Sequence, residues 1–258
     1  MPDLFLLEDA SISGTARLVM AHADALIARG QSARIVTAGA PPAWRASNAD
    51  WVYVEDLRNY RAADDERVVE IAKLPILVDD ELFRANVSRE NDPLRVLLCG
   101  SWDKEAHGIE AGYGAVAHAR WFHQKLDLIR VSPWAPSREE PVEAVQEFHV
   151  ALTAAEMTRL MHSCDVLIAP NRREDRLPLP TAEGLASSLA CVMTATPIHR
   201  SFDELHDYAL FAPEDNAIEL GERLIELLDD GELRERLRTR GREVAEQWRV
   251  HRESRPSP

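Results

Sequence analysis

Two carboxylates and the start of a helix are the groups in this chain best suited to chemistry. An apolar run ends at Pro170, a polar loop follows, and Asp175 and Glu183 flank the point near Thr181 where a helix is expected to begin. Ligands of open α/β sheets bind where strands end, and a helix N-terminus there offers N–H groups and a positive dipole end to a phosphate. The pattern predicts a phosphate-bearing ligand between two carboxylates.

Alternating strands and helices must position this loop. Apolar runs predict strands at residues 4–7, 33–37, 94–100, 126–131, 147–150, 166–170, 190–194 and 208–211. Helical spacing predicts helices at residues 16–30, 108–124, 153–162, 181–188, 217–229 and 232–248. This alternation indicates parallel sheets and a doubly wound α/β fold. Residues 43–78 give only weak signals, and they stay unplaced.

The polar stretch at residues 88–93 marks a domain boundary. We therefore expect an N-terminal unit of residues 1–85, a C-terminal unit of residues 86–250 and a frayed tail of residues 251–258.

Composition excludes several classes of protein. The 258 residues carry a net charge of −14, which argues against a nucleic-acid partner because a polyanion needs a basic face. No apolar run approaches the roughly 20 residues of a membrane-spanning helix, and the N-terminus lacks a signal peptide, so we expect a cytoplasmic protein. The three cysteines, Cys99, Cys164 and Cys191, lie in or beside apolar runs, and they are predicted to be core residues rather than disulfides or zinc ligands.

Several segments together resemble one known family. Residues 175–184, Asp-Arg-Leu-Pro-Leu-Pro-Thr-Ala-Glu-Gly, align without gaps with a loop written Glu-Gly-Phe-Gly-Leu-Pro-x-x-Glu-Ala, and residues 79–84, 163–170 and 211–215 resemble further segments in the same order. That written pattern belongs to the C-terminal nucleotide-sugar domain of family 4 (group 1) retaining glycosyltransferases, which this chain therefore resembles. The resemblance implies a GT-B fold of two Rossmann-type units, the N-terminal one truncated and the C-terminal one complete.

The resemblance also implies roles for individual residues. Glu183 would accept hydrogen bonds from the ribose hydroxyls of a nucleotide, and Asp175 would contact the donor sugar. At the helix start, the N–H groups of the segment Leu179, Pro180, Thr181 and Ala182 would cradle the diphosphate, without a metal or another cofactor. Gly14, in a turn similar to the family's first loop, would face the donor phosphates.

The chain departs from the family at two basic positions and in length. Ser101 and His107 stand where the family has Arg and Lys, so Lys104 in the same loop, or a protonated His107, would assist the diphosphate. An acceptor domain of this type needs about 150 residues, more than the first unit has, so a partner chain could complete the acceptor side.

The resemblance therefore predicts a retaining glycosyltransferase in cell-envelope polysaccharide biosynthesis. Its donor would be a nucleotide diphosphate-sugar, and its acceptor a glycan, a lipid or a small molecule. The alternative is a non-catalytic relative that binds a nucleotide-sugar or a protein partner, which the altered basic pair favours. A dehydrogenase is disfavoured because no G-x-G-x-x-G follows the first strand.

Overall fold

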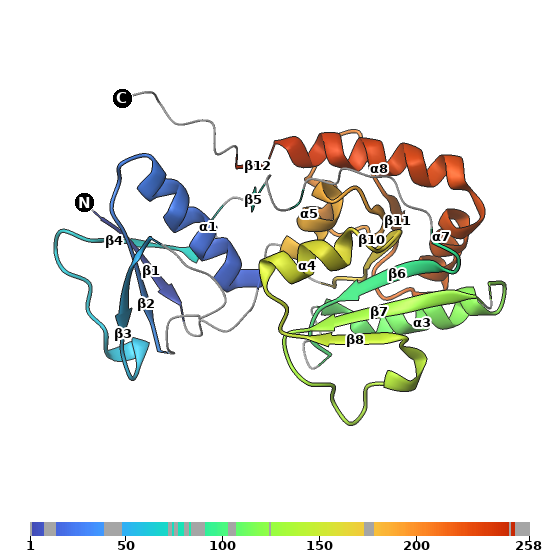
Figure 1. Ribbon diagram of the computed structural model, residues 1–258, viewed down its shortest axis with the longest axis horizontal. Coiled ribbons are helices and arrows are strands. Elements are labelled where there is room, and N and C mark those ends of the chain that lie inside the picture. Colours follow the sequence, from blue (N-terminus) through green and yellow to red (C-terminus); the bar gives the residue numbers. More distant parts are fainter. Residues whose placement is uncertain are drawn as a thin grey trace. The chain divides into compact units, whose positions relative to one another are not determined.

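The chain divides into two α/β units, each built on a parallel sheet (Figure 1). The computed structural model describes residues 2–7, 14–38, 48–71, 74, 77–79, 83, 91–102, 107–123, 125–172, 178–247 and 249–250. Unit 1 comprises residues 1–81 and 248–258, and unit 2 comprises residues 82–247. No helix within the described ranges is long and apolar enough to cross a membrane.

Unit 1 contains a four-stranded parallel sheet in the order β3-β2-β1-β4. Its elements are β1 (Asp3–Leu7), α1 (Gly14–Ala28), β2 (Ala33–Thr37), β3 (Asp50–Tyr53), the 3-10 turn η1 (Leu57–Asn59), β4 (Arg67–Val69), β5 (Val78–Asp79) and β12 (Arg249–Val250). The predicted strand, helix and strand at the N-terminus are confirmed. The two edge strands, β3 and β4, lie in the segment that the sequence left unplaced.

Unit 2 contains a six-stranded parallel sheet in the order β11-β10-β9-β6-β7-β8. Its elements are β6 (Leu94–Cys99), α3 (Ile109–Arg120), β7 (Leu126–Ser132), η4 (Val142–Ala144), β8 (Glu147–Val150), α4 (Ala154–Met161), β9 (Val166–Ala169), α5 (Leu179–Ala186), β10 (Ala190–Thr194), α6 (Pro197–Arg200), β11 (Leu210–Ala212), α7 (Ala217–Asp229) and α8 (Gly231–Glu246). The chain builds β6, β7 and β8 outward and then returns to place β9 on the other side of β6.

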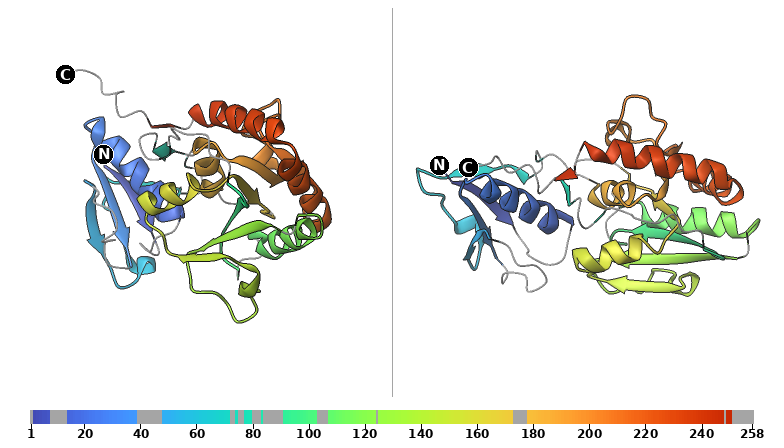
Figure 2. Two further views of the ribbon diagram at one scale, coloured as in Figure 1. Left: turned by 45° about the vertical axis from the view of Figure 1, so that its right-hand side comes forward. Right: turned by 45° about the horizontal axis from the view of Figure 1, so that its top comes forward.

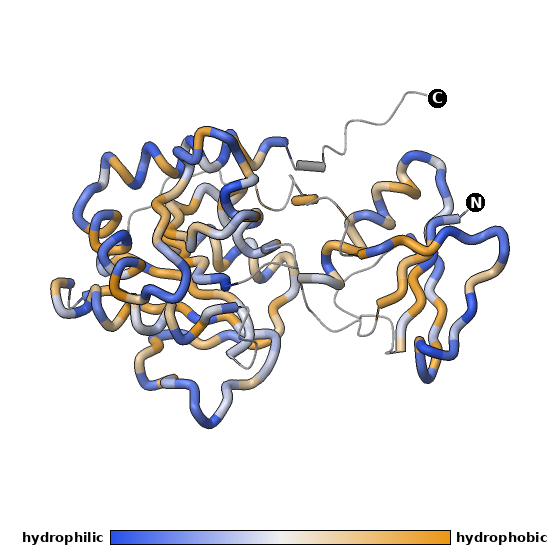
Figure 3. The backbone as a smooth tube through the Cα atoms, turned by 180° about the vertical axis from the view of Figure 1, so that it is seen from behind, coloured by the Kyte–Doolittle hydropathy of each residue, from blue (hydrophilic) through white to orange (hydrophobic). Residues whose placement is uncertain are grey.

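Helices cover both faces of the unit 2 sheet (Figure 2). Hydrophobic residues follow the strands, whereas α8 alternates between polar and apolar residues (Figure 3). Two glycines let α5 lie close to its neighbours on both sides. A Cβ at Gly184 would come within 2.5 Å of the Leu167 side chain in β9, and one at Gly241 in α8 within 2.7 Å of Leu185 in α5. Helix α5 is therefore packed tightly between the sheet and α8.

A buried carboxylate fastens the start of β9 to its surroundings. Asp165 is fully buried and accepts hydrogen bonds from the backbone N–H of Arg95 at 2.8 Å and from the Asn91 side chain at 2.8 Å. Arg238 of α8 donates to the same carboxylate at 3.3 Å. Asp165 thus joins β9, the start of β6 and α8 at the amino ends of the strands.

Helix and strand limits mostly agree with the sequence predictions, with a few differences. The division between units falls at residues 81 and 82, near the expected 85 and 86. Residues 249–250, which were assigned to the C-terminal unit, instead pair with β5 in unit 1. Cys164 and Cys191 are buried as predicted, whereas Cys99 is only half-buried. The tail from residue 251 lies outside the described residues.

We expect Asp165→Asn to destabilise unit 2 by about 3 kcal/mol, because an amide removes the buried partner of Arg238, leaves it only the more distant and exposed Glu235, and turns one acceptor into a donor. Urea unfolding measures the loss. The control is Asp207→Asn, which removes an exposed partner of Arg240 at 2.7 Å and should cost less than about 1 kcal/mol. Equal losses in the two variants would contradict the role assigned to Asp165.

Candidate functional site

The ends of β6 and β9 form the topological switch point of the unit 2 sheet. Leu98 pairs with Ile168, so the two neighbouring strands end level with each other. The chain leaves β6 toward α3 and leaves β9 toward α5, and these two loops together with α5 contain all the predicted site residues except Gly14. Ligands of such sheets bind at the carboxyl ends of the strands near this reversal. We call this side of unit 2 the carboxyl edge.

Gly108 brings the two loops into contact. Its φ is +60°, and a Cβ added there would lie 1.9 Å from the carbonyl oxygen of Pro170. Only a glycine fits this close approach in the left-handed region without displacing the backbone. The residue that precedes α3 therefore rests directly on the residue that follows β9.

Helix α5 begins two residues earlier than predicted, and this corrects the expected phosphate cradle. Pro180 has no N–H, and the N–H groups of Thr181 and Ala182 both donate to the Pro178 carbonyl, at 2.9 and 3.2 Å. Of the four residues expected to bind the diphosphate, only Leu179 has an N–H without a backbone acceptor in the described part of the chain. The prediction of a cradle made by all four residues was wrong.

Glu183 lies in the second turn of α5 rather than the first, and it is 2% exposed. Burial of a carboxylate is costly, so a buried acidic residue at the carboxyl edge is a candidate for a specific binding role. Asp175 and Lys104 lie outside the described residues, and their roles stay predictions.

His107 and Ser101 are neighbours in the loop after β6. The Ser101 backbone N–H donates to Nδ1 of His107 at 2.7 Å. A ring nitrogen that accepts a hydrogen bond carries no proton, so this arrangement holds the imidazole neutral. The protonated His107 expected from the sequence would have to break this bond. The Ser101 side chain is buried, and neither residue supplies the charge of the family's basic pair.

A buried ion pair supports the same loop from β7. Nε of Arg130 donates to the Glu140 carboxylate at 2.8 Å, and both side chains are almost fully buried. The Tyr113 hydroxyl donates to the same oxygen at 3.1 Å, and its ring meets that of Trp102 edge-on at 5.8 Å. Burial, and the nearby charge of Glu140, raise the pKa of Tyr113, so the phenol stays protonated. These contacts fix Trp102, which directly follows Ser101.

Arg172 is a candidate that the sequence analysis missed. It lies three residues after β9, and its Cγ would be 3.5 Å from a Cβ at Gly108. Its guanidinium forms an ion pair with Asp215, which follows β11. The sequence did offer one signal, which is a basic residue just after the buried strand β9. Its acidic partner Asp215 lies 43 residues later, so local spacing does not reveal the pair.

His199, in α6 after β10, is a buried neutral imidazole. Its Nδ1 lies 2.9 Å from the Thr194 carbonyl oxygen and donates to it. Burial lowers the pKa of His199 from 6.5 to about 4, although the Thr194 carbonyl opposes this shift. His199 packs edge-on against the Phe202 ring and holds the chain that follows β10.

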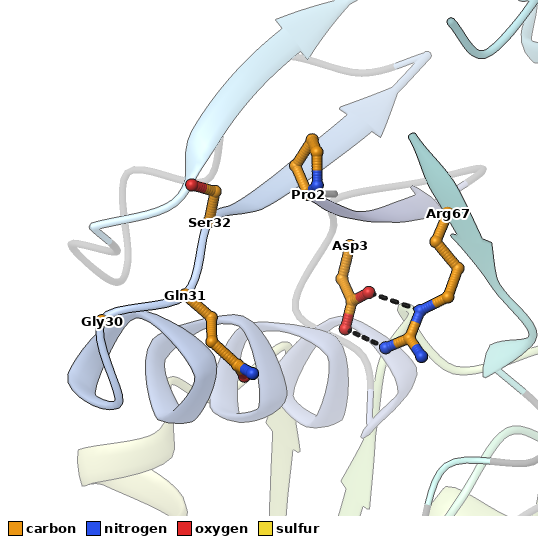
Figure 4. A pocket seen from close by; sticks show the side chains of 6 residues that line it. All are labelled: Pro2, Asp3, Gly30, Gln31, Ser32 and Arg67. Atoms are coloured by element: carbon orange, nitrogen blue, oxygen red, sulfur yellow. Dashed lines mark hydrogen bonds and ion pairs between the residues drawn. The ribbon is translucent and has the colours of Figure 1, made fainter. Parts of the chain in front are cut away.

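Unit 1 contributes a different kind of feature. Gly14 begins α1 there, and nothing in the described residues tests its predicted contact with phosphates. A cavity of about 480 Å³ lies at the amino ends of β1, β2 and β4, lined by Pro2, Asp3, Gly30, Gln31, Ser32 and Arg67 (Figure 4). Arg67 binds Asp3 through two hydrogen bonds of 2.6 Å. This cavity is at the edge opposite to the one where parallel sheets bind ligands.

No group of three or more His, Cys, Asp or Glu side chains among the described residues is arranged to hold a metal ion. Metal independence therefore stays a prediction.

One family model matches part of unit 2. Residues 136–244 match the model of the family described as glycosyl transferases group 1. No curated protein sequence matches the chain.

Solved structures show the same fold. WaaG, a glycosyltransferase involved in lipopolysaccharide biosynthesis, matches with a TM-score of 0.69 and 13% identity over 95% of each chain. Sucrose-phosphate synthase from Thermosynechococcus elongatus gives a TM-score of 0.68 and 14% identity, over 96% of this chain and 94% of that one. HepE from Anabaena, in complex with UDP-glucose, gives a TM-score of 0.66 and 11% identity, over 96% of this chain and 95% of that one. These likenesses confirm the predicted GT-B-like α/β architecture, and the shortened first unit stays a prediction.

We expect Gly108→Ala to destabilise unit 2 by about 3 kcal/mol or more, because the new Cβ adds a collision with Pro170 to the strain of a left-handed backbone. The control is Gly30→Ala in unit 1, where φ is +75° and no atom lies within 4 Å of the added Cβ. It should cost only the strain, about 1–2 kcal/mol. Chemical unfolding compares the two, and a similar cost would show that the Pro170 contact yields freely.

His199 should make unit 2 less stable as the pH falls from 6.5 toward 4. In this interval His199 binds a proton in the unfolded chain but not in the folded one, where its pKa is near 4. The free energy of unfolding therefore falls by on the order of 3 kcal/mol as the pH drops from 6.5 to 4. Unfolding free energies measured at several pH values in wild type and His199→Gln should show a shallower slope in the variant. The exposed control His206→Asn should keep the wild-type slope, and an unchanged slope in His199→Gln would refute the assignment.

Proposed function

We propose that this protein transfers a sugar from a nucleotide diphosphate-sugar to an acceptor with retention of configuration, because residues 136–244 match the model of the group 1 glycosyl transferases. The observation that carries the proposal is the buried carboxylate of Glu183 in α5, the helix that follows the switch-point strand β9. HepE in complex with UDP-glucose supports a nucleotide-sugar donor. WaaG supports an acceptor among cell-envelope glycans or lipids.

In the proposed reaction, the bond between the anomeric carbon of the sugar and the diphosphate breaks as an acceptor oxygen bonds to the same face of that carbon. The proton of the acceptor hydroxyl passes to the departing diphosphate oxygen. The diphosphate gains negative charge as it leaves. The positive end of the α5 dipole and the Leu179 N–H stabilise that charge without a metal. Glu183 holds the ribose, and Asp175 and Lys104 take the donor-sugar and diphosphate roles that the resemblance implies.

A second candidate function is a non-catalytic relative that binds a nucleotide-sugar or a protein partner. The neutral arrangement of Ser101 and His107 favours it, since neither residue stabilises a developing dianion. The two functions share donor binding and differ in turnover.

We expect one of UDP, GDP or dTDP to bind without metal, and Glu183→Gln to weaken that binding by roughly tenfold or more, because the amide has one acceptor oxygen instead of two and no charge to strengthen the hydrogen bonds from the ribose hydroxyls. Calorimetric titration measures the affinities. Glu147→Gln, which changes a half-exposed carboxylate on β8, should bind as wild type does.

Two further comparisons sharpen this test. Removing a ribose hydroxyl from the bound nucleotide should weaken wild type but have little further effect in Glu183→Gln. Slow release of free sugar from the matching donor would support the transferase, whereas binding without release supports the non-catalytic relative. If no nucleotide binds, the proposed function is wrong.

A further inference from the structure

We propose that Arg172 binds the diphosphate at the carboxyl edge and that Asp215 occupies its guanidinium until the ligand arrives. Arg172 would then supply the positive charge that Ser101 and His107 do not. This inference rests on the proposed function, because it adds one residue to the same site.

The backbone before Arg172 is fixed at the carboxyl edge. The Thr194 hydroxyl, at the end of β10, donates to the carbonyl of Asn171. Pro170 lies under Gly108, as the close contact of that glycine requires. The aliphatic part of the Arg172 side chain therefore lies beside Gly108, where the loop after β9 touches the loop after β6.

The present partner of Arg172 is a weak competitor. Asp215 is 64% exposed and lies in the turn between β11 and α7, with a φ of +59°. An ion pair with such an exposed carboxylate is screened by solvent and contributes little. A diphosphate offers more negative charge and several oxygens that match the planar guanidinium fork. Exchange of Asp215 for a diphosphate should therefore be favourable.

Other groups described at this edge are less suited to the role. Arg130 is fully buried and already bound to Glu140. His107 accepts a hydrogen bond at Nδ1 and is held neutral. Arg172 is 26% exposed, so it can reach a ligand while its backbone stays in place.

The test titrates inorganic pyrophosphate, and whichever of UDP, GDP or dTDP binds, in metal-free buffer. Arg172→Gln should weaken both ligands by roughly tenfold or more. Asp215→Asn should strengthen both by about two- to fivefold, and this gain should vanish in the double variant with Arg172→Gln. The control Glu214→Gln removes an equal charge from the neighbouring exposed residue, and it should change both affinities less than Asp215→Asn does. Thermal unfolding checks that each variant is folded.

The outcomes separate this inference from the proposed function. Nucleotide binding that depends on Glu183 but not on Arg172, or that is lost in Lys104→Gln instead, would overturn the inference alone. Pyrophosphate binding that depends on Arg172, with no nucleotide bound, would keep the anion site and reject the nucleotide-sugar donor. A gain in Asp215→Asn that persists without Arg172 would show that Asp215 acts through the general field, and it would reject the exchange.

Discussion

The pairing of β9 with β6, held at its start by Asp165, determines where every other part of the site lies. Asp165 binds the Arg95 backbone and Arg238, so β9 cannot slide or move to the far edge of the sheet. If β9 paired with β8 instead of β6, it would lie three strand spacings, about 14 Å, from β6. The loops that contain Gly108 and Pro170 would then be too far apart to touch. A buried interaction at the amino ends of the strands thus creates the site at their carboxyl ends.

Close packing turns that arrangement into a rigid one. Gly184 and Gly241 allow β9 and α8 to approach α5 from opposite sides, and the helix is buried along nearly its whole length. A helix held in this way has little freedom to adjust when a ligand binds, so Glu183 stays where the sheet puts it. Precise placement of a binding carboxylate depends on this kind of support. The two glycines therefore contribute to the site although neither would touch a ligand.

The sequence predicts the elements of unit 2 well because buried parallel strands are continuous apolar runs, as in Val166–Ala169. Its signal is weak at β3 and β4, because their exposed and half-buried residues give edge strands no clear period. It also misses the start of α5, since a proline fits the first turn of a helix as readily as the loop before it. The Ser101–His107 bond and the Arg172–Asp215 pair depend on tertiary contacts, which local spacing does not encode.

At the carboxyl edge, Ser101 and His107 stand where the family that the chain resembles has two loop cations. A permanently open cation would hold a diphosphate most strongly after the sugar has left, when its charge is greatest, and so would slow its release. A guanidinium shared with Asp215 behaves differently, because the carboxylate competes for it again as soon as the ligand shifts. In the proposed site this exchange reduces affinity for the leaving group while keeping a cation in reach of it. An altered basic pair is therefore compatible with turnover, provided that the replacement cation has a competing partner nearby.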